Sequence, residues 1–97
     1  MPTYVTLIHW TQQGIQNVKQ SLDRLEAGRK DWRAAGGDIK AAYFTMGQYD
    51  AVLIGEAPND EVASRLALGI GRQGNVRTET NRAYTEDEFR KILAALP

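Results

Sequence analysis

The middle of the chain holds two short apolar runs, which lie between Ala42 and Ala57 and are joined by the tetrapeptide Met46-Gly47-Gln48-Tyr49. Apolar runs joined by a short loop that contains glycine are typical of a β-hairpin. A lone hairpin is only marginally stable in water, so it needs further strands beside it or a helix across it. The other segments must therefore complete a sheet around this hairpin.

The residues outside the hairpin predict two more strands and three helical regions. Segments rich in β-branched and aromatic residues indicate strands, whereas apolar residues at steps of three and four indicate helices. The predicted order is strand 3–10, helix 11–35, strands 38–45 and 51–57, helix 60–73, strand 76–84 and a helix after Thr85. This is the βαββαβ order of the ferredoxin-like fold with an extra C-terminal helix, an α+β class. A chain of 97 residues suits a single domain, 1–97.

Several helix ends are predicted from local signals. Thr11 is expected to cap the first helical region, and Ser21 offers a second cap with a break near Gln20. Thr85-Glu86-Asp87-Glu88 predicts a capping box for the last helix. Four apolar residues of that helix are expected to anchor it: Phe89, Ile92, Leu93 and Leu96.

The sequence Gly69-Ile70-Gly71-Arg72-Gln73-Gly74 has the spacing of a dinucleotide-binding loop. However, it leaves a helix and enters a strand, whereas that motif follows a strand and opens a helix. We interpret it as the end of a helix and a loop.

The first predicted strand is apolar on both faces. Val5 and Leu7 point one way, and Tyr4, Ile8 and Trp10 point the other way. A sheet with one face in water alternates more cleanly between apolar and polar residues. We therefore expect the second face to meet another copy of the chain, in a homodimer or a higher homo-oligomer.

Charge and composition narrow the function classes. Twelve basic and twelve acidic residues balance, which gives no electrostatic reason to expect nucleic acid binding. There is no cysteine and only one histidine, so we expect no disulfide, no metal site and no cofactor. No apolar run is long enough for a membrane helix, and no signal peptide is apparent, so a cytoplasmic location is expected.

Several spaced motifs together resemble the GYD domain family. They are Tyr4-Val5-x-Leu7, Trp10-Thr11-x-Gln13-Gly14-Ile15, Met46-Gly47-Gln48-Tyr49-Asp50, Glu56-Ala57-Pro58 and Asn75-Val76-Arg77-Thr78-Glu79-Thr80. The resemblance implies an assembly of the dimeric α/β-barrel type, in which two ferredoxin-like sheets pack face to face. It supplies no reaction, because barrels of this type include small-molecule-binding regulators, cofactor-free monooxygenases and isomerases.

Two residues are candidates for catalysis. His9 is the only side chain whose ordinary pKa, about 6.5, lies near neutrality, which suits a general base. The structural alternative is a polar residue near a strand end. Asp50 is either a base or a turn residue that accepts hydrogen bonds from backbone amides.

Five residues are candidates for ligand binding: Trp10, Tyr43, Tyr49, Arg77 and Thr80. Aromatic walls with a few polar groups are the usual anatomy of a small-ligand site. Arg77 can hold an anion through its forked donors or pair with Glu79 on the same strand face. We expect a small, mostly apolar cavity, which is touched by His9, Trp10, Tyr43, Asp50, Arg77 and Thr80.

Three functions remain open. The chain is expected to bind a small metabolite or act as a regulatory module. The first alternative is a cofactor-free enzyme, isomerase-like or monooxygenase-like, that abstracts a proton from a small aromatic or anionic substrate. The second alternative is a structural or partner-binding subunit.

Overall fold

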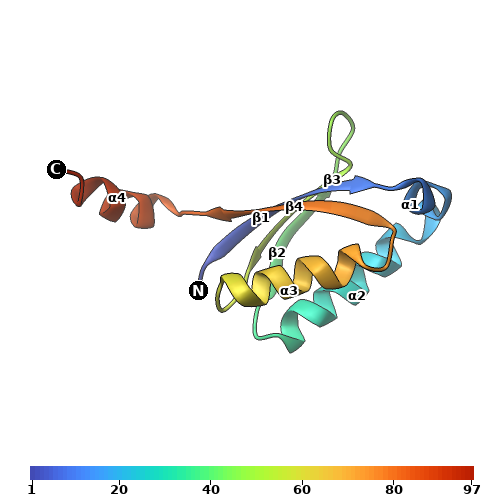
Figure 1. The fold of residues 1–97 in the computed structure, drawn as a ribbon, viewed down its shortest axis with the longest axis horizontal. Helices are drawn as coiled ribbons and strands as arrows, with labels where there is room; N and C mark the ends of the chain where they lie inside the picture. The colour runs from blue at the N-terminus through green and yellow to red at the C-terminus, as the bar shows by residue number, and fades with distance from the viewer.

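The computed structural model describes all residues, Met1–Pro97 (Figure 1). The first half contains β1 (Thr3–Trp10), α1 (Gln12–Gln16), the short 3₁₀ helix η1 (Val18–Gln20), α2 (Ser21–Ala34) and β2 (Asp38–Phe44). The second half contains β3 (Ala51–Glu56), α3 (Asp60–Gly71), β4 (Val76–Ala83) and α4 (Glu86–Ala94). No helix is long and apolar enough to span a membrane.

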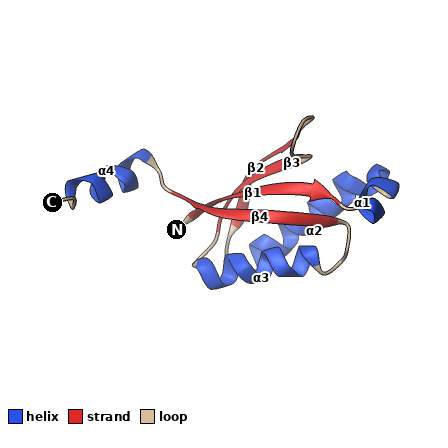
Figure 2. Cartoon of the chain, turned by 45° about the horizontal axis from the view of Figure 1, so that its top comes forward, coloured by secondary structure: helices blue, strands red, loops and turns tan.

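The four strands form one antiparallel sheet in the order β2-β3-β1-β4. The central strand β1 pairs with β3 on one side and with β4 on the other, so that Leu7 lies between Val52 and Glu79. This topology confirms the predicted ferredoxin-like fold. Helices α2 and α3 lie on one face of the sheet, and no helix lies on the other face (Figures 1 and 2).

The covered face of the sheet carries most of the hydrophobic core. Alternate residues of β1 point toward the helices, and Tyr4 and Ile8 are 3% and 6% exposed. Trp32 of α2 packs beneath β3, where a Cβ atom on Gly55 would lie 2.6 Å from the indole ring. The buried apolar residues are Tyr4, Ile8, Trp32, Ile39, Ala51, Leu53, Ala57, Val62 and Ala63.

The opposite face, which we call the open face, is also apolar at its centre. It is formed by Val5 and Leu7 of β1 and by Val52 and Ile54 of β3, which lie opposite one another in register. No helix covers these four residues, and all four are partly exposed. Strand β1 is therefore apolar on both faces, as predicted, with Tyr4 and Ile8 on the helix side and Val5 and Leu7 on the open face.

The helix ends follow local chemistry with one exception. The Thr11 side chain accepts a hydrogen bond from the Gly14 amide, which confirms the predicted cap of α1. The chain breaks at η1 before α2, as expected, but Ser21 is not the cap. Gln20 occupies the N-cap position without a side-chain hydrogen bond, and the Ser21 hydroxyl accepts a hydrogen bond from Arg24 instead.

The glycine-rich segment ends α3, in agreement with the interpretation from sequence. Helix α3 stops at Gly71, and Gly74 in the following loop has φ +87°, which suits a residue without a Cβ atom. The Asn59 side chain accepts a hydrogen bond from the Val62 amide and caps the start of α3.

Helix α4 corrects one prediction. Its capping box is present, because the Thr85 hydroxyl accepts from the Glu88 amide and the Glu88 carboxylate accepts from the Thr85 amide. The helix does not, however, anchor to its own domain. It projects beyond the sheet with Phe89, Leu93 and the rest of its apolar stripe exposed (Figure 1). The periodicity correctly predicts an apolar face, but it carries no information about which surface covers that face.

Candidate functional site

A cleft of about 330 Å³ opens between α2 and α3 and reaches down to the covered face of the sheet. Residues of α2 and of the second half of α3 form its walls, and it reaches the end of β1 at Trp10. Its floor is made by side chains from β1, β2, β3 and α2. The apolar floor residues include Ile8, Trp10, Trp32, Ile39, Phe44 and Leu53.

The aromatic side chains give the cleft a stacking surface. Trp10 at the end of β1 and Phe44 at the end of β2 are nearly parallel, with ring centroids 6.5 Å apart and an interplanar angle of 19°. Trp32 lines the cleft from α2. Three aromatic rings on an otherwise aliphatic floor suit a flat apolar molecule.

Charged side chains from both helices line the same cleft. Arg24 and Asp31 belong to α2, and Arg65 belongs to α3. The Arg24 guanidinium donates to the Asn17 carbonyl at 3.0 Å and to the Ser21 hydroxyl at 3.2 Å, and it has no carboxylate partner. Arg65 makes no hydrogen bond or ion pair. Both guanidinium groups can therefore donate hydrogen bonds to an anionic group of a ligand without breaking an existing ion pair.

Two glycines keep the walls of the cleft open. Gly28 of α2 and Gly69 of α3 both line it, and a Cβ atom on either residue would meet no other atom within 4 Å. Glycine inside a helix costs about 1 kcal/mol relative to alanine. Packing does not require these two glycines, and larger side chains at the same positions would extend into the cleft.

A separate polar cluster lies on the open face. The rings of His9 and Tyr49 are 4.8 Å apart, and His9 Nε2 lies 3.9 Å from the Glu79 carboxylate. The Tyr49 hydroxyl donates to the same carboxylate at 3.3 Å. The negative charge of Glu79 is the main reason that the pKa of Tyr49 is raised above its usual value.

Asp50 has a structural role in this arrangement. The backbone amide of Trp10 donates to Asp50 Oδ2 at 2.8 Å, and the Asp50 amide donates to the Ile8 carbonyl at 2.8 Å. These two bonds hold the start of β3 against the end of β1. The carboxylate thus accepts from a backbone amide, as one of the two sequence interpretations proposed.

The ligand candidates from sequence are divided by the sheet. Trp10 lines the cleft, whereas Tyr43 and Tyr49 do not. Arg77 lies opposite His9 in register and forms no ion pair with Glu79. Thr80 lies on the helix side of β4, where its hydroxyl is 3.3 Å from that of Thr6. No single cavity brings together the seven residues singled out from the sequence, and no cluster of three or more metal-ligating side chains is present.

Sequence reasoning did not propose Arg24, Gly28 or Arg65 for a site, and it interpreted Gly69 only as part of a helix end. Gly28 carried a usable signal, because a glycine inside a predicted helix often has a packing or functional reason. The two arginines carried none, since surface arginines on helices are common and their positions around one cleft depend on the tertiary structure.

Comparisons with known proteins agree with this architecture. A curated protein of Thermus thermophilus, described as a glutamine synthetase and cystathionine beta-lyase binding protein, is 30% identical over 84 residues, covering 86% of this chain and 88% of that protein.

Two solved structures share the fold. FFRP-DM1 matches with a TM-score of 0.60 at 20% identity, covering 87% of this chain and 100% of that chain. A hypothetical protein of Pyrococcus horikoshii matches with a TM-score of 0.56 at 19% identity, covering 89% of this chain and 93% of that chain. The family profile described as the GYD domain matches residues 4–93, nearly the whole length. The chain therefore belongs to the GYD domain family.

Proposed function

We propose that this protein is a small-molecule-binding, regulatory module whose ligand occupies the cleft between α2 and α3. The observation that carries this proposal is a cleft of about 330 Å³ with an aromatic floor and two arginines that lack carboxylate partners. Small-ligand sites have volumes of roughly 300–1,000 Å³ and combine apolar walls with a few polar groups. The cleft is at the lower end of this range, so it suits a small metabolite.

The lining indicates the class of ligand. Trp10, Trp32 and Phe44 favour an aromatic or other flat apolar body. Arg24 and Arg65 favour an acidic group, because a guanidinium binds a carboxylate through two donors in a fixed fork. We therefore propose an aromatic or aliphatic carboxylic acid as the ligand.

The proposed assembly is a homodimer formed through the open face. Two copies of that face would bury Val5, Leu7, Val52 and Ile54 against each other. The helices, and with them the clefts, would remain on the outside of the dimer. A ligand could then enter each cleft without separating the two copies.

Intrinsic fluorescence tests the ligand proposal, because both tryptophans of the chain line the cleft. Hydrocinnamate is the probe, and its neutral alcohol analogue tests the need for the acid. The acid should change the tryptophan emission in a saturable manner and should bind at least about tenfold more tightly than the alcohol, which corresponds to about 1.4 kcal/mol.

Matched glycine variants of α3 localise the binding. Gly69→Leu places a side chain in the cleft, whereas Gly71→Leu adds the same side chain on the same helix outside the cleft. The first variant should lose binding, and the second should keep it. If neither a panel of apolar acids nor their neutral analogues changes the emission, the proposal fails.

A second candidate function is partner binding. The relative of 30% identity is named for binding two enzymes, and this chain has apolar surface free on its open face and on α4. Co-elution with purified glutamine synthetase from the same organism in size-exclusion chromatography would support this function. Separate elution at micromolar concentrations of both proteins would count against it.

The cofactor-free enzyme is less favoured. That hypothesis needs a base and a hydrogen-bond donor that converge on one cavity, yet neither His9 nor Asp50 lines the cleft. His9 lies with Tyr49 and Glu79 on the open face, and Asp50 is occupied by the Trp10 amide.

A further inference from the structure

Helix α4 has an apolar stripe with no partner inside its own chain. Phe89, Ile92 and Leu93 lie on one face of α4, and Leu96 follows just beyond its end; they are 49%, 42%, 50% and 63% exposed. No other element packs extensively against α4. A helix of nine residues is only marginally stable in water without a packing surface. The stripe therefore requires a surface from outside the chain.

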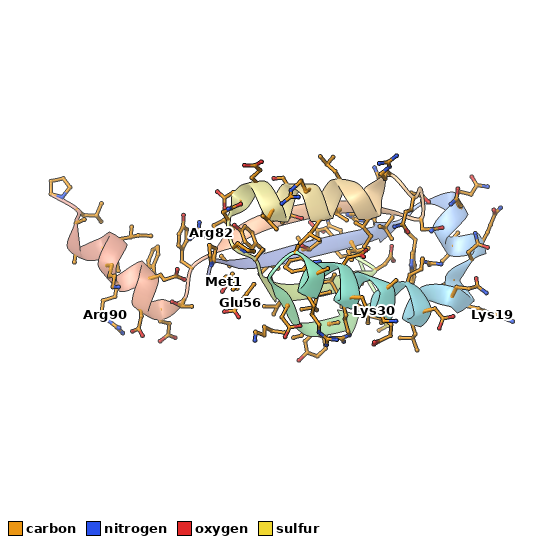
Figure 3. The ribbon with its side chains drawn as sticks, turned by 90° about the horizontal axis from the view of Figure 1, so that it is seen from below. Met1, Lys19, Lys30, Glu56, Arg82 and Arg90 are labelled. Carbon is orange, nitrogen blue, oxygen red and sulfur yellow. The ribbon has the colours of Figure 1, made fainter.

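The junction before α4 holds the helix away from its own domain. Arg82, at the end of β4, lies 3.6 Å from the Asp60 carboxylate on the domain and 3.9 Å from the Glu88 carboxylate on α4. Its guanidinium also lies over the Tyr84 ring, 5.2 Å from the centroid. Figure 3 shows Arg82 between the domain and the projecting helix. These contacts on both sides favour the extended position of α4 over one folded back on the chain.

The accessible surface area of the chain is larger than that of a compact monomer, which supports a missing partner. The chain exposes 6616 Å², whereas a compact monomer of 10.8 kDa exposes about 5,500 Å². The excess of about 1,100 Å² exceeds the roughly 800 Å² that each partner buries in a standard protein interface. The radius of gyration, 14.5 Å, is likewise larger than the roughly 12.5 Å of a compact domain of this length.

A groove whose apolar and charged residues match those of α4 runs between α3 and the edge strand β4. Its apolar wall contains Ala67 and Leu68, and Leu68 is 72% exposed. Three arginines line the same groove, Arg72, Arg77 and Arg82, and the one acidic residue that lines it, Asp60, lies 3.6 Å from Arg82. The first turn of α4 carries the opposite charge, with Glu86, Asp87 and Glu88. An apolar stripe that begins with acidic residues thus complements an apolar groove bordered by arginines.

We propose that α4 is an exchanged arm, which packs its apolar stripe into the α3–β4 groove of a second copy of this chain. The exchange is reciprocal, so that each copy gives one helix and receives one. In its seat the helix buries Leu68 and covers the free edge of β4. This contact is distinct from the proposed pairing of the open faces, and both tests below use chains that carry Val52→Asp, which opposes that pairing.

The first test is a pair of charge variants on opposite faces of α4. Leu93→Glu places a carboxylate in the apolar stripe, and Lys91→Glu places the same side chain on the exposed polar face. Sedimentation velocity should show a dimer dissociation constant at least about tenfold higher for Leu93→Glu and changed less than about threefold for Lys91→Glu. Equal constants for the two variants would overturn the proposal.

The second test locates the seat of the helix and does not depend on the fold of a destabilised variant. The chain lacks cysteine, so single cysteines can be introduced cleanly. A tagged Ile92→Cys chain is oxidised with an untagged Leu68→Cys chain or, as the control, with an untagged Leu22→Cys chain. Leu22 is similarly exposed, at 66%, but lies on α2.

A mixed disulfide dimer should form at least about fivefold more with Leu68→Cys than with Leu22→Cys, because a disulfide requires Cβ atoms about 4 Å apart. Equal yields would overturn the proposed seat. A double variant, Ile92→Cys with Leu68→Cys, that forms mainly an internal disulfide at nanomolar concentration would show that α4 folds back on its own chain, which also overturns the exchange.

Discussion

The two faces of the sheet are built from the same strands and have different environments. On β1, Tyr4 and Ile8 are buried beneath the helices, whereas their neighbours Val5 and Leu7 remain partly exposed on the open face. Alternation along a strand assigns successive residues to opposite faces, and both sets are apolar. This chain therefore covers only one of the two apolar faces of its sheet with its own helices.

The covered face is itself incomplete at one end. Where α2 ends, it is closed by Trp32 and its neighbours, but between Gly28 and Gly69 it opens into the cleft. No helix covers the open face. The proposed ligand is large enough to fill the first gap, whereas the proposed cover of the second is the same face of another copy.

The largest expected effect concerns the covered face. Trp32→Ala should lower the free energy of unfolding by about 3–5 kcal/mol, because it removes a large buried side chain and leaves a cavity. Tyr43→Ala on the open face, where Tyr43 is 62% exposed, should cost less than about 1 kcal/mol in dilute protein. Urea unfolding measures both. Equal decreases in the free energy of unfolding for the two variants would contradict the difference between the two faces.

The next effect concerns the open face. Val52→Asp should weaken dimerisation by about 3 kcal/mol, roughly a hundredfold in dissociation constant, because it places an unpaired carboxylate in the proposed interface. Val52→Thr has a similar shape without a charge and should weaken dimerisation much less. Light scattering over a dilution series measures the dimer dissociation constants of both variants. A Val52→Asp dimer of unchanged stability would show that the faces do not pair.

A smaller effect follows from Tyr4, whose hydroxyl donates to Asp60 at 2.5 Å. Burial, and then this hydrogen bond, raise the pKa of Tyr4 to about 12. The unfolded chain releases this proton near pH 10, and the folded chain keeps it. The stability from Tyr4 is therefore complete below about pH 10 and is lost as the pH rises through about 12.

Tyr4→Phe isolates this contribution, because phenylalanine cannot ionise. Urea midpoints measured between about pH 9 and pH 11 should fall less steeply for the variant than for the natural chain. Parallel pH profiles would contradict the assignment of a buried, protonated phenol to Tyr4.

The smallest effect concerns two glycines near the same core. Gly28→Ala should stabilise the fold by about 0.5–1 kcal/mol, because the new methyl group meets no other atom and alanine favours the helix. Gly55→Ala should destabilise it, since its Cβ atom would lie 2.6 Å from Trp32. Thermal unfolding distinguishes the two. Destabilisation by Gly28→Ala would mean that the cleft is narrower than described.

The sequence predicted the order of the elements because that order depends on local signals. The periodicity switches from two to about 3.6 at Thr11, Gly36 ends α2, and the capping box at Thr85 starts α4. The break at η1 was also foreseen, although its cap was assigned to Ser21 rather than Gln20. A helix start without a side-chain cap leaves no local signal at the position before it.

The candidate site was much less predictable. Arg24 and Arg65 lie far apart in the sequence and meet at one cleft only because α2 and α3 cross the same face of the sheet. His9 and Trp10 are neighbours in sequence but point to opposite faces, so the single cavity expected around them does not form. Sequence patterns determine which face a residue occupies, whereas a cleft depends on how far two helices stand apart.

Both margins of the sheet are poor templates for further strands. Edge strand β4 carries Arg77, Glu79 and Arg82, and edge strand β2 has an irregularity in its pairing at Lys40. Charges and bulges on edges discourage strand-by-strand growth into fibrils. Strands of further copies should consequently not add to either edge, and concentrated solutions should not form fibrils through strand pairing.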